Sequence, residues 1–427
     1  MERVSAGTDT STRPAEPAEV VGSRRGLLRV WGPGLIVMLA DTDAGCLVTA
    51  AQSGASWGYA LLIPQLLLIP ILFMVQEITV RLGIVTGKGH GLLIREHFGR
   101  GWGYLSAGTL LLSSIGALLT EFAGIAGVGE LFGVSRWFTI PVATVLLLAV
   151  ALLGRYRRAE RIGILVGLGE LAFIVAMVLA GPKLGDIVSG ATSIPLNQPG
   201  YLYLLAANIG AVIMPWMIFY QQTAVVEKGL TVAALPRERR DTAFGAVLTQ
   251  VIMIAVIVTL AATVFTHGLK PTLNTVGDIA TAVTPFLGGT PAKVLIGAAV
   301  LGGGLVAALV VSLAGSWGVA DVMGWKHSLN SRIDRSSWKF YTVYALAHIL
   351  GAVVVLSAAD LVTLAVDVEV MNALLLPIVL GFLLALEVKA LPKEHMMRGA
   401  YRWTVWILCG IVMAFGLYMV PVSLLPH

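Results

Sequence analysis

Charged residues are scarce in this sequence. Of its 427 residues only 12% are charged, whereas a soluble globular domain carries roughly 25%. Hydrophobic residues make up 57%, and the mean hydropathy is +0.86. This balance excludes an ordinary soluble protein and a peripheral membrane protein. It predicts an all-α protein embedded in the lipid bilayer.

Cysteine is also nearly absent, and so are the motifs of common enzymes. The two cysteines, Cys46 and Cys409, have no paired spacing, so neither a disulfide framework nor a zinc cluster is expected. The sequence has no phosphate-binding loop, no ATP-binding segment and no credible catalytic triad. We therefore expect neither an enzyme nor an ATP-driven pump, and no cofactor.

No cleavable signal peptide is visible at the start of the sequence. Residues 1–30 are polar and rich in Ser, Thr, Pro, Ala and Arg, so we expect a disordered cytoplasmic tail. The first membrane span would then serve as the anchor.

Long apolar runs take the place of charge. A membrane-spanning helix needs about 20 mostly apolar residues, and on this criterion the sequence predicts eleven spans. Their approximate limits are 32–54, 58–82, 102–132, 137–154, 160–181, 200–227, 243–266, 294–322, 340–358, 361–388 and 402–422. We expect spans 1–5 (residues 31–190) and 6–10 (residues 191–390) to be two repeats, and they would be inverted because a unit of five spans inverts its successor. Residues 391–427 add span 11 and a short outside C-terminus.

The distribution of basic residues supports this count. With a cytoplasmic N-terminus, 25 of the 29 Lys and Arg residues fall on the cytoplasmic side, as the positive-inside rule requires. Those left outside are Arg136, Lys183, Lys270 and Lys293. The net charge of +5 therefore orients helices and does not indicate a nucleic-acid partner. We expect a multi-pass protein of the bacterial plasma membrane.

Ionisable residues inside membrane spans are candidates for function, because they are costly to keep there. In this sequence they are Asp41, Asp43, Glu77, Glu121, Glu130, Glu170, His348, Asp367 and Glu369. No Lys or Arg lies deep in any expected span, so cations or protons must neutralise the acids. We interpret four of the acids, Glu77, Glu130, Glu170 and Asp367, as hydrated groups near span ends. We interpret His348 as a packed or lumen-facing histidine.

Spans 1 and 6 each contain a helix-breaking sequence near the middle. These are Asp43–Cys46 ("DAGC") and Met214–Trp216 ("MPW"). Glycine permits unwound backbone, and proline removes a helical hydrogen bond. Interrupted spans at corresponding positions of two repeats point to the binding site of a secondary transporter.

The side chains at this midpoint suggest a metal ion as the substrate. They include a carboxylate (Asp43), a thiol (Cys46) and a thioether (Met214), together with freed backbone carbonyls. Oxygen ligands suit magnesium, calcium or manganese, and sulfur ligands suit softer transition metals. A simple packing role for either sulfur-containing side chain remains open.

At these residues the sequence resembles the NRAMP family of divalent metal transporters (natural resistance-associated macrophage proteins). The family signatures are Asp-Pro-Gly-Asn in span 1 and Met-Pro-His in span 6, and the two breaking sequences take those places. Further similarities are Gly32-Pro33-Gly34, "RLGIVTGK" at residues 81–88 and "LFG" at residues 131–133. The resemblance covers spans 1–11. It implies a leucine-transporter-like inverted repeat with helices 1 and 6 broken at mid-membrane, and transport of divalent metal ions by alternating access.

The resemblance also implies a set of metal ligands. Asp43 would be the central ligand and Met214 the thioether ligand, while Cys46 replaces the family's asparagine ligand. Two alanines match positions whose backbone carbonyls bind the ion in one or the other access state. Glu369 matches a glutamine that visits the site in relatives. The predicted set is therefore Asp43, Cys46, Met214, Ala40, Ala211 and Glu369.

Three departures from the family concern proton movement. Trp216 replaces the histidine tied to protons, Gly124 replaces the second carboxylate after Glu121, and no arginine is found at the expected depth in span 9. This pattern is similar to the magnesium-transporting branch of the family, in which proton coupling is absent. We therefore expect transport of Mg²⁺ or Mn²⁺ without protons.

Two alternatives stay open at this point. One is a proton-coupled Mn²⁺/Fe²⁺ symporter of the same family, and the other is a carrier of small organic solutes on the same scaffold. The sequence does not determine the oligomeric state, and it is compatible with a monomer.

Overall fold

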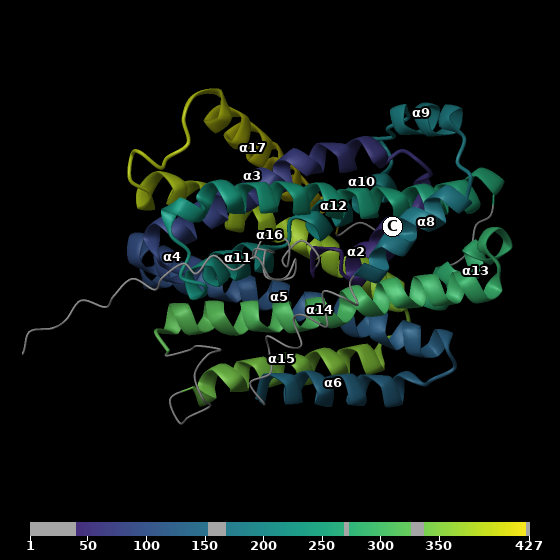
Figure 1. Cartoon of the computed structure of the whole chain (residues 1–427), viewed down its shortest axis with the longest axis horizontal. Coiled ribbons are helices and arrows are strands. Elements are labelled where there is room, and N and C mark those ends of the chain that lie inside the picture. Colours follow the sequence, from purple (N-terminus) through teal and green to yellow (C-terminus); the bar gives the residue numbers. More distant parts are fainter. Residues whose placement is uncertain (1–39, 153–167, 269–272, 326–336, 424–427) are drawn as a thin grey trace, which may run out of the picture. The chain divides into compact units, whose positions relative to one another are not determined.

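A computed structural model describes residues 40–152, 168–268, 273–325 and 337–423 of the chain (Figure 1). The regular structure in these ranges is helical, with no strand among them. The longer helices are α2 (Ala44–Trp57), α3 (Leu62–Thr86), α5 (Arg100–Leu131), α6 (Arg136–Leu152), α10 (Pro199–Val212), α11 (Pro215–Glu227), α12 (Leu235–Thr263), α14 (Gly289–Met323), α15 (Trp338–Ser357), α16 (Leu361–Ala390) and α17 (Gly399–Val422). The shorter ones are α4 (His90–Phe98), α8 (Ala172–Leu179), α9 (Leu184–Thr192) and α13 (Val276–Leu287), with short 3-10 turns η2 (Leu168–Leu171), η3 (Val232–Ala234) and η4 (Phe265–His267).

The described residues contain eight helices that are long and apolar enough to cross a membrane. They are α3, α5, the α10–α11 pair, α12, α14, α15, α16 and α17. The segments η2–α8 and α9 meet this criterion only together, and they bend by 108° where they join. Expected spans 1, 4 and 5 lie partly outside the described ranges. The chain is a multi-pass membrane protein, and the number eleven stays a prediction.

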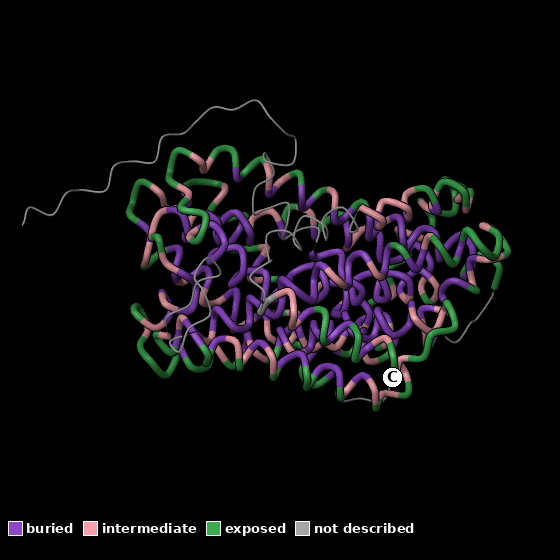
Figure 2. The backbone as a smooth tube through the Cα atoms, turned by 60° about the horizontal axis from the view of Figure 1, so that its bottom comes forward, coloured by how far each residue is buried: buried purple, intermediate pink, exposed green. Residues whose placement is uncertain are grey.

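The helices differ in how deeply they are buried (Figure 2). In the α10–α11 pair 89% of the most apolar stretch is buried within the protein, compared with 28% in α17. Helix α10 packs against α16, α2 against α12, and α5 against α14. The broken spans therefore occupy the interior, surrounded by the uninterrupted helices.

Close approach of α10 and α16 depends on one glycine. A Cβ atom placed on Gly210 would lie 1.8 Å from the carbonyl oxygen of Glu369. Small residues at helix interfaces let backbones meet in this way in membrane proteins. Gly210 therefore brings the segment of α16 that carries Glu369 against the end of α10.

Both expected breaks are present. Residues 42–43 separate a helical turn from α2, and residues 213–214 separate α10 from α11. Pro215 is the first residue of α11, where its missing N–H would have no helical partner in any case. Asp43 caps α2, and its Oδ1 accepts a hydrogen bond from the backbone N–H of Cys46 at 2.8 Å.

Three helices fall outside the predicted spans, namely α4, α9 and α13. They have 9, 9 and 12 residues, too few for a search based on membrane-crossing length. In α4, His90 is fully buried and its Nδ1 lies 2.8 Å from Oε1 of Gln222. Burial lowers the pKa of His90 to about 4, so this histidine is neutral at physiological pH.

Candidate metal site

Three metal-ligating side chains meet at the break in span 1. Asp43 and Cys46 lie at the start of α2, and Glu369 lies on α16. One ligand atom from each falls within 4.8 Å of the other two, and all three residues are buried. Among the described residues, no other group of His, Cys, Asp and Glu has this spacing.

Gly45 of the "DAGC" motif allows the side chain of Glu369 to approach the start of α2. A Cβ atom on Gly45 would lie 2.5 Å from Oε1 of Glu369 and 2.9 Å from the side chain of Thr120. The other carboxylate oxygen, Oε2, accepts a hydrogen bond from Asn372 Nδ2 at 3.0 Å, and Asn372 accepts one from Ser113 Oγ at 2.8 Å. Oε1 of Glu369 has no hydrogen-bond partner in the described part of the chain. One oxygen is thus held in place and the other is available to an ion.

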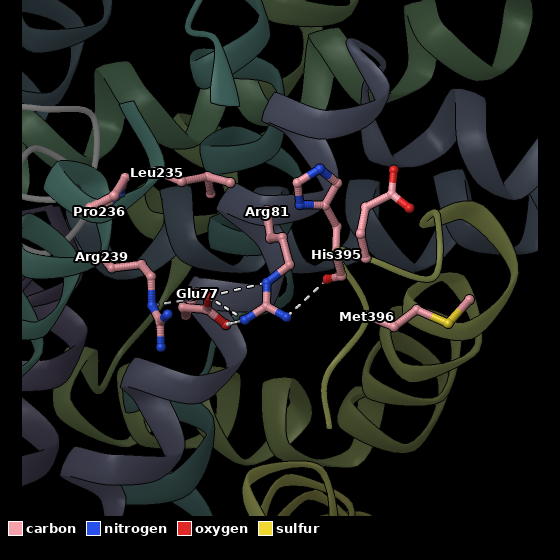
Figure 3. A pocket seen from close by; sticks show the side chains of 8 residues that line it. Glu77, Arg81, Leu235, Pro236, Arg239, His395 and Met396 are labelled. Atoms are coloured by element: carbon pink, nitrogen blue, oxygen red, sulfur yellow. Dashed lines mark hydrogen bonds and ion pairs between the residues drawn. The ribbon is translucent and has the colours of Figure 1, made fainter. Parts of the chain in front are cut away.

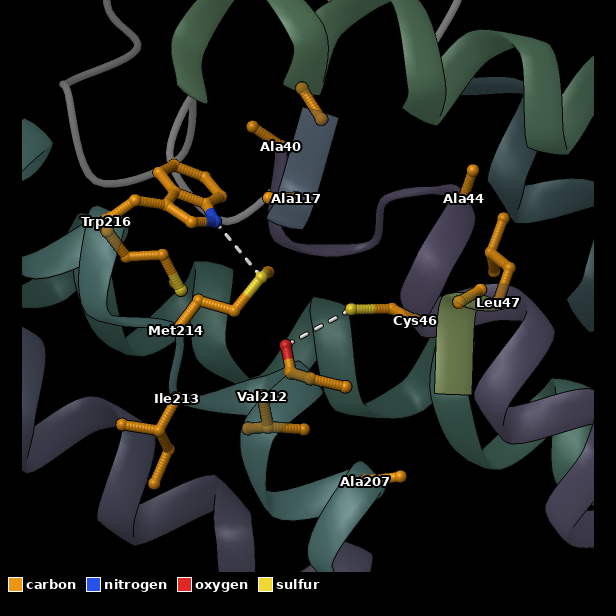
Figure 4. Packing of buried hydrophobic residues seen from close by; sticks show 14 of the residues in the cluster. Ala40, Ala44, Cys46, Leu47, Ala117, Ala207, Val212, Ile213, Met214 and Trp216 are labelled. Atoms are coloured by element: carbon orange, nitrogen blue, oxygen red, sulfur yellow. Dashed lines mark hydrogen bonds between the residues drawn. The ribbon is translucent and has the colours of Figure 1, made fainter. Parts of the chain in front are cut away.

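The two broken spans are joined by the thiol of Cys46. Its Sγ donates a hydrogen bond to the carbonyl oxygen of Ala211 at 3.1 Å (Figure 4). Met214 lies in the same buried cluster, and its Sδ accepts a hydrogen bond from Nε1 of Trp216 at 3.0 Å. Ala40 is also buried in this cluster. The structure thus gathers the predicted residues around the two breaks, and metal binding by them stays a prediction.

Three more carboxylates surround the break. Oε2 of Glu121 accepts a hydrogen bond from the backbone N–H of Ala44 at 3.3 Å. Glu170, on η2, accepts a hydrogen bond from the hydroxyl of Thr42. Asp41 is fully buried beside them. The interpretation of Glu170 as a hydrated group is therefore wrong, because its side chain is fully buried and bonded to the unwound segment.

A family model described as natural resistance-associated macrophage protein-like (Nramp) matches residues 34–421. This chain belongs to the Nramp family. It is 31% identical over 319 residues to the divalent metal cation transporter MntH 1 of Pseudomonas aeruginosa, covering 70% of this chain and 71% of the relative. It is also 31% identical over 324 residues to MntH of Deinococcus radiodurans, covering 71% of each chain. These Nramp relatives are named as transporters, in agreement with the prediction that the chain is not an enzyme.

Solved structures confirm the predicted fold class. The manganese transporter of Eremococcus coleocola, in complex with an aromatic bis-isothiourea substituted compound, matches with a TM-score of 0.74 and 18% identity over 94% of this chain and 89% of its own. MhsT in complex with L-phenylalanine matches with a TM-score of 0.64 and 14% identity over 91% of this chain and 98% of its own. At these identities the likeness shows the fold alone.

In this Nramp chain the glycine at position 124 is a packing residue. A Cβ atom on Gly124 would lie 2.3 Å from Cβ of Ala44 and 3.0 Å from a methyl group of Val300. Helix α2 thus occupies the space into which a larger side chain at position 124 would extend. The carboxylate that the resemblance places at this position in relatives would clash with α2, so glycine permits the close contact between α2 and α5.

Glu77 of this Nramp chain lies in a separate charged network. It forms ion pairs with Arg81 at 2.5 Å and with Arg239 at 3.2 Å, beside a pocket of about 280 Å³ (Figure 3). Tyr401 also donates a hydrogen bond to Glu77 at 3.2 Å. The expectation that Glu77 is simply hydrated, with no basic partner, is therefore wrong. The sequence contained a signal in Arg81, which follows Glu77 by one helical turn.

Glu130 and Asp367, two other acids within the expected spans, have partners away from the two breaks. Glu130 pairs with Arg136 at 2.5 Å, and Asp367 accepts a hydrogen bond from Tyr203 at 2.6 Å. His348 is packed, with Nδ1 lying 2.9 Å from the carbonyl oxygen of Tyr344. These groups are not part of the candidate site.

We expect Glu77→Gln to destabilise the protein without weakening metal binding. The substitution leaves the largely buried guanidinium of Arg81 without its carboxylate, and breaking such a pair is strongly destabilising. The melting temperature of the purified protein should fall by several degrees, while calorimetric Mn²⁺ affinity changes less than about twofold. Asp367→Asn is the matched control. A large loss of Mn²⁺ affinity in a stably folded Glu77→Gln protein would contradict the assignment.

Proposed function

We propose that this chain transports a divalent metal cation across the membrane by alternating access. The observation that carries the proposal is the buried trio of Asp43, Cys46 and Glu369 where span 1 is broken. Ligand atoms within 4.8 Å of one another suit direct coordination of one ion, since metal–oxygen distances are about 2.0–2.6 Å. The relatives named as divalent metal cation transporters support this substrate class.

Manganese is the first ion to test, and magnesium is the second. The trio combines two carboxylates with a thiol, and sulfur ligands suit transition metals better than magnesium. Magnesium gives up water reluctantly, whereas ligand atoms within 4.8 Å of one another suit an ion that has shed its water on that side.

We propose further that metal transport is not coupled to protons. Proton-linked carriers use titratable groups along a path through the membrane. Here position 216 holds a tryptophan that is bonded to Met214, and position 124 holds a glycine that is packed against α2. His348 is engaged by the hydroxyl of Ser312 on α14 and by the carbonyl oxygen of Tyr344 on its own helix. The ion would then be driven by the membrane potential, which contributes about 2.3 kcal/mol per charge per 100 mV and about twice that for a dication.

Proteoliposomes that contain a pH-sensitive dye test this proposal. We expect Mn²⁺ uptake to increase with an imposed inside-negative potential and internal pH to stay constant, because the dication carries the charge alone. Liposomes with the Asp43→Ala protein serve as the control. Internal acidification that follows metal entry and disappears in Glu121→Gln would show that protons move with the metal.

Proton-coupled symport of Mn²⁺ or Fe²⁺ is the second candidate. It is favoured by one observation: the side chain of Glu121 interacts with that of Asp43 and also accepts a hydrogen bond at the break. A carrier for organic solutes fits less well, because the break in span 1 is surrounded by buried carboxylates and the break in span 6 is filled by the buried side chains of Met214 and Trp216. The dye experiment separates the two metal-transport mechanisms.

We also propose the bacterial plasma membrane as the location, with a cytoplasmic N-terminus. The bacterial relatives and the distribution of basic residues support this placement. Reporter domains fused to either end of the chain test the orientation. Size-exclusion chromatography with light scattering measures the oligomeric state, for which a monomer is compatible with the sequence.

A further inference from the structure

The break in span 1 gathers more negative charge than one divalent ion can neutralise. Its five carboxylates belong to Asp41, Asp43, Glu121, Glu170 and Glu369. All are 0% exposed, and no ion pair between described residues involves any of them. A buried charge without a partner is costly. If one ion occupies the trio, Asp41 and Glu170 must be neutralised by a second cation or by protons.

Glu170 and Thr42 form a small cradle against α14. A Cβ atom on Gly303 would lie 2.6 Å from the carbonyl oxygen of Thr42 and 2.9 Å from Oε1 of Glu170. Both oxygens therefore converge on the face of α14 that this glycine leaves open. Oε2 of Glu170 is held by the Thr42 hydroxyl, whereas Oε1 has no hydrogen-bond partner among the residues that the structure describes.

Asp41 supplies a further buried carboxylate near the break. It precedes the unwound residues 42–43, and neither of its oxygens has a hydrogen-bond partner within the described ranges. Its charge interacts with those of Asp43, Glu369 and Glu170. Asp41 therefore adds negative charge close to the break, and of the three carboxylates it interacts least with Glu170.

We propose that the carbonyl oxygen of Thr42 and the carboxylate of Glu170 bind a second cation, separate from the ion at Asp43, Cys46 and Glu369, with the charge of Asp41 adding to the negative potential around them. The donors of this second site are all oxygen atoms, so it selects a hard cation, of which Na⁺ and Mg²⁺ are the abundant examples. The bound cation joins the unwound part of span 1 to η2 and α14. The proposal does not depend on which metal is transported.

Thermal unfolding of the full-length protein in detergent tests the second site. The protein is first saturated with Mn²⁺ in choline chloride, and choline is then replaced by Na⁺ in one arm or supplemented with Mg²⁺ in the other at constant ionic strength. A cation that binds only the folded protein stabilises it by mass action, so we expect a rise in melting temperature of about 2 °C or more in one arm. The responding arm identifies the cation as monovalent or divalent.

Four variants decide where that cation binds. Glu170→Gln should lose the rise in melting temperature. Gly303→Ala, which places a methyl group in the cradle, should lose it as well. Gly108→Ala on α5, where a Cβ meets open space, should keep it. Asp43→Ala should keep it as well, even if it has lost Mn²⁺ binding, which separates this site from the proposed transport site. No rise in wild type in either arm, or an equal rise in Glu170→Gln, would overturn the proposal.

Discussion

Asp43→Ala should abolish divalent metal binding and uptake. The carboxylate of Asp43 belongs to the trio whose ligand atoms lie within 4.8 Å of one another, at the N-terminal end of α2. Removing it leaves one carboxylate and a thiol, so we expect Mn²⁺ affinity to fall at least about 100-fold. Isothermal calorimetry on purified protein and Mn²⁺ uptake into proteoliposomes measure the two effects.

The matched variant Asp43→Asn separates ligation from helix capping. Asp43 also accepts the hydrogen bond from the N–H of Cys46, and losing such a cap costs about 0.5–2 kcal/mol. Asparagine can keep this hydrogen bond but has no charge. We therefore expect Asp43→Asn to fold as stably as wild type and still lose Mn²⁺ binding. Wild-type uptake by either variant would remove Asp43 from the proposed site.

Cys46→Ser should weaken cadmium binding by about tenfold or more while changing Mg²⁺ binding little, because a sulfur ligand favours soft ions. Serine keeps a donor for the carbonyl oxygen of Ala211, so the contact between the two broken spans can be retained. Competition of Cd²⁺ and of Mg²⁺ against radioactive Mn²⁺ measures both affinities on the same preparation.

Cys409→Ser is the control for this substitution. Cys409 is also a buried free thiol, but it lies on α17 and not at either break. We expect it to leave both competition curves unchanged. If the Cd²⁺ and Mg²⁺ curves of Cys46→Ser shift together, the thiol of Cys46 packs between the breaks and does not bind the ion.

The amino-acid sequence by itself determined the membrane character, the helical fold and the position of both breaks. Apolar runs are local in sequence, and so are the effects of glycine and proline on the backbone, because each acts within one helical turn. For this reason the "DAGC" and "MPW" motifs placed the ends of α2, α10 and α11 correctly. Acidic residues inside the spans, which are energetically costly in a membrane, could also be located from the sequence alone.

Only the tertiary structure decided which acids share a site. Cys46 meets Ala211 across 165 residues, and Thr42 meets Glu170 across 128. Glu77 and Glu170 were both interpreted from the sequence as hydrated acids near span ends, yet one pairs with Arg81 and Arg239 and the other bonds to the break in span 1. These pairings depend on which helix faces touch, and glycines such as Gly303 and Gly210 set those contacts by letting backbones approach. A linear pattern does not specify such contacts, because the same residues could face lipid, water or another helix until the helices pack.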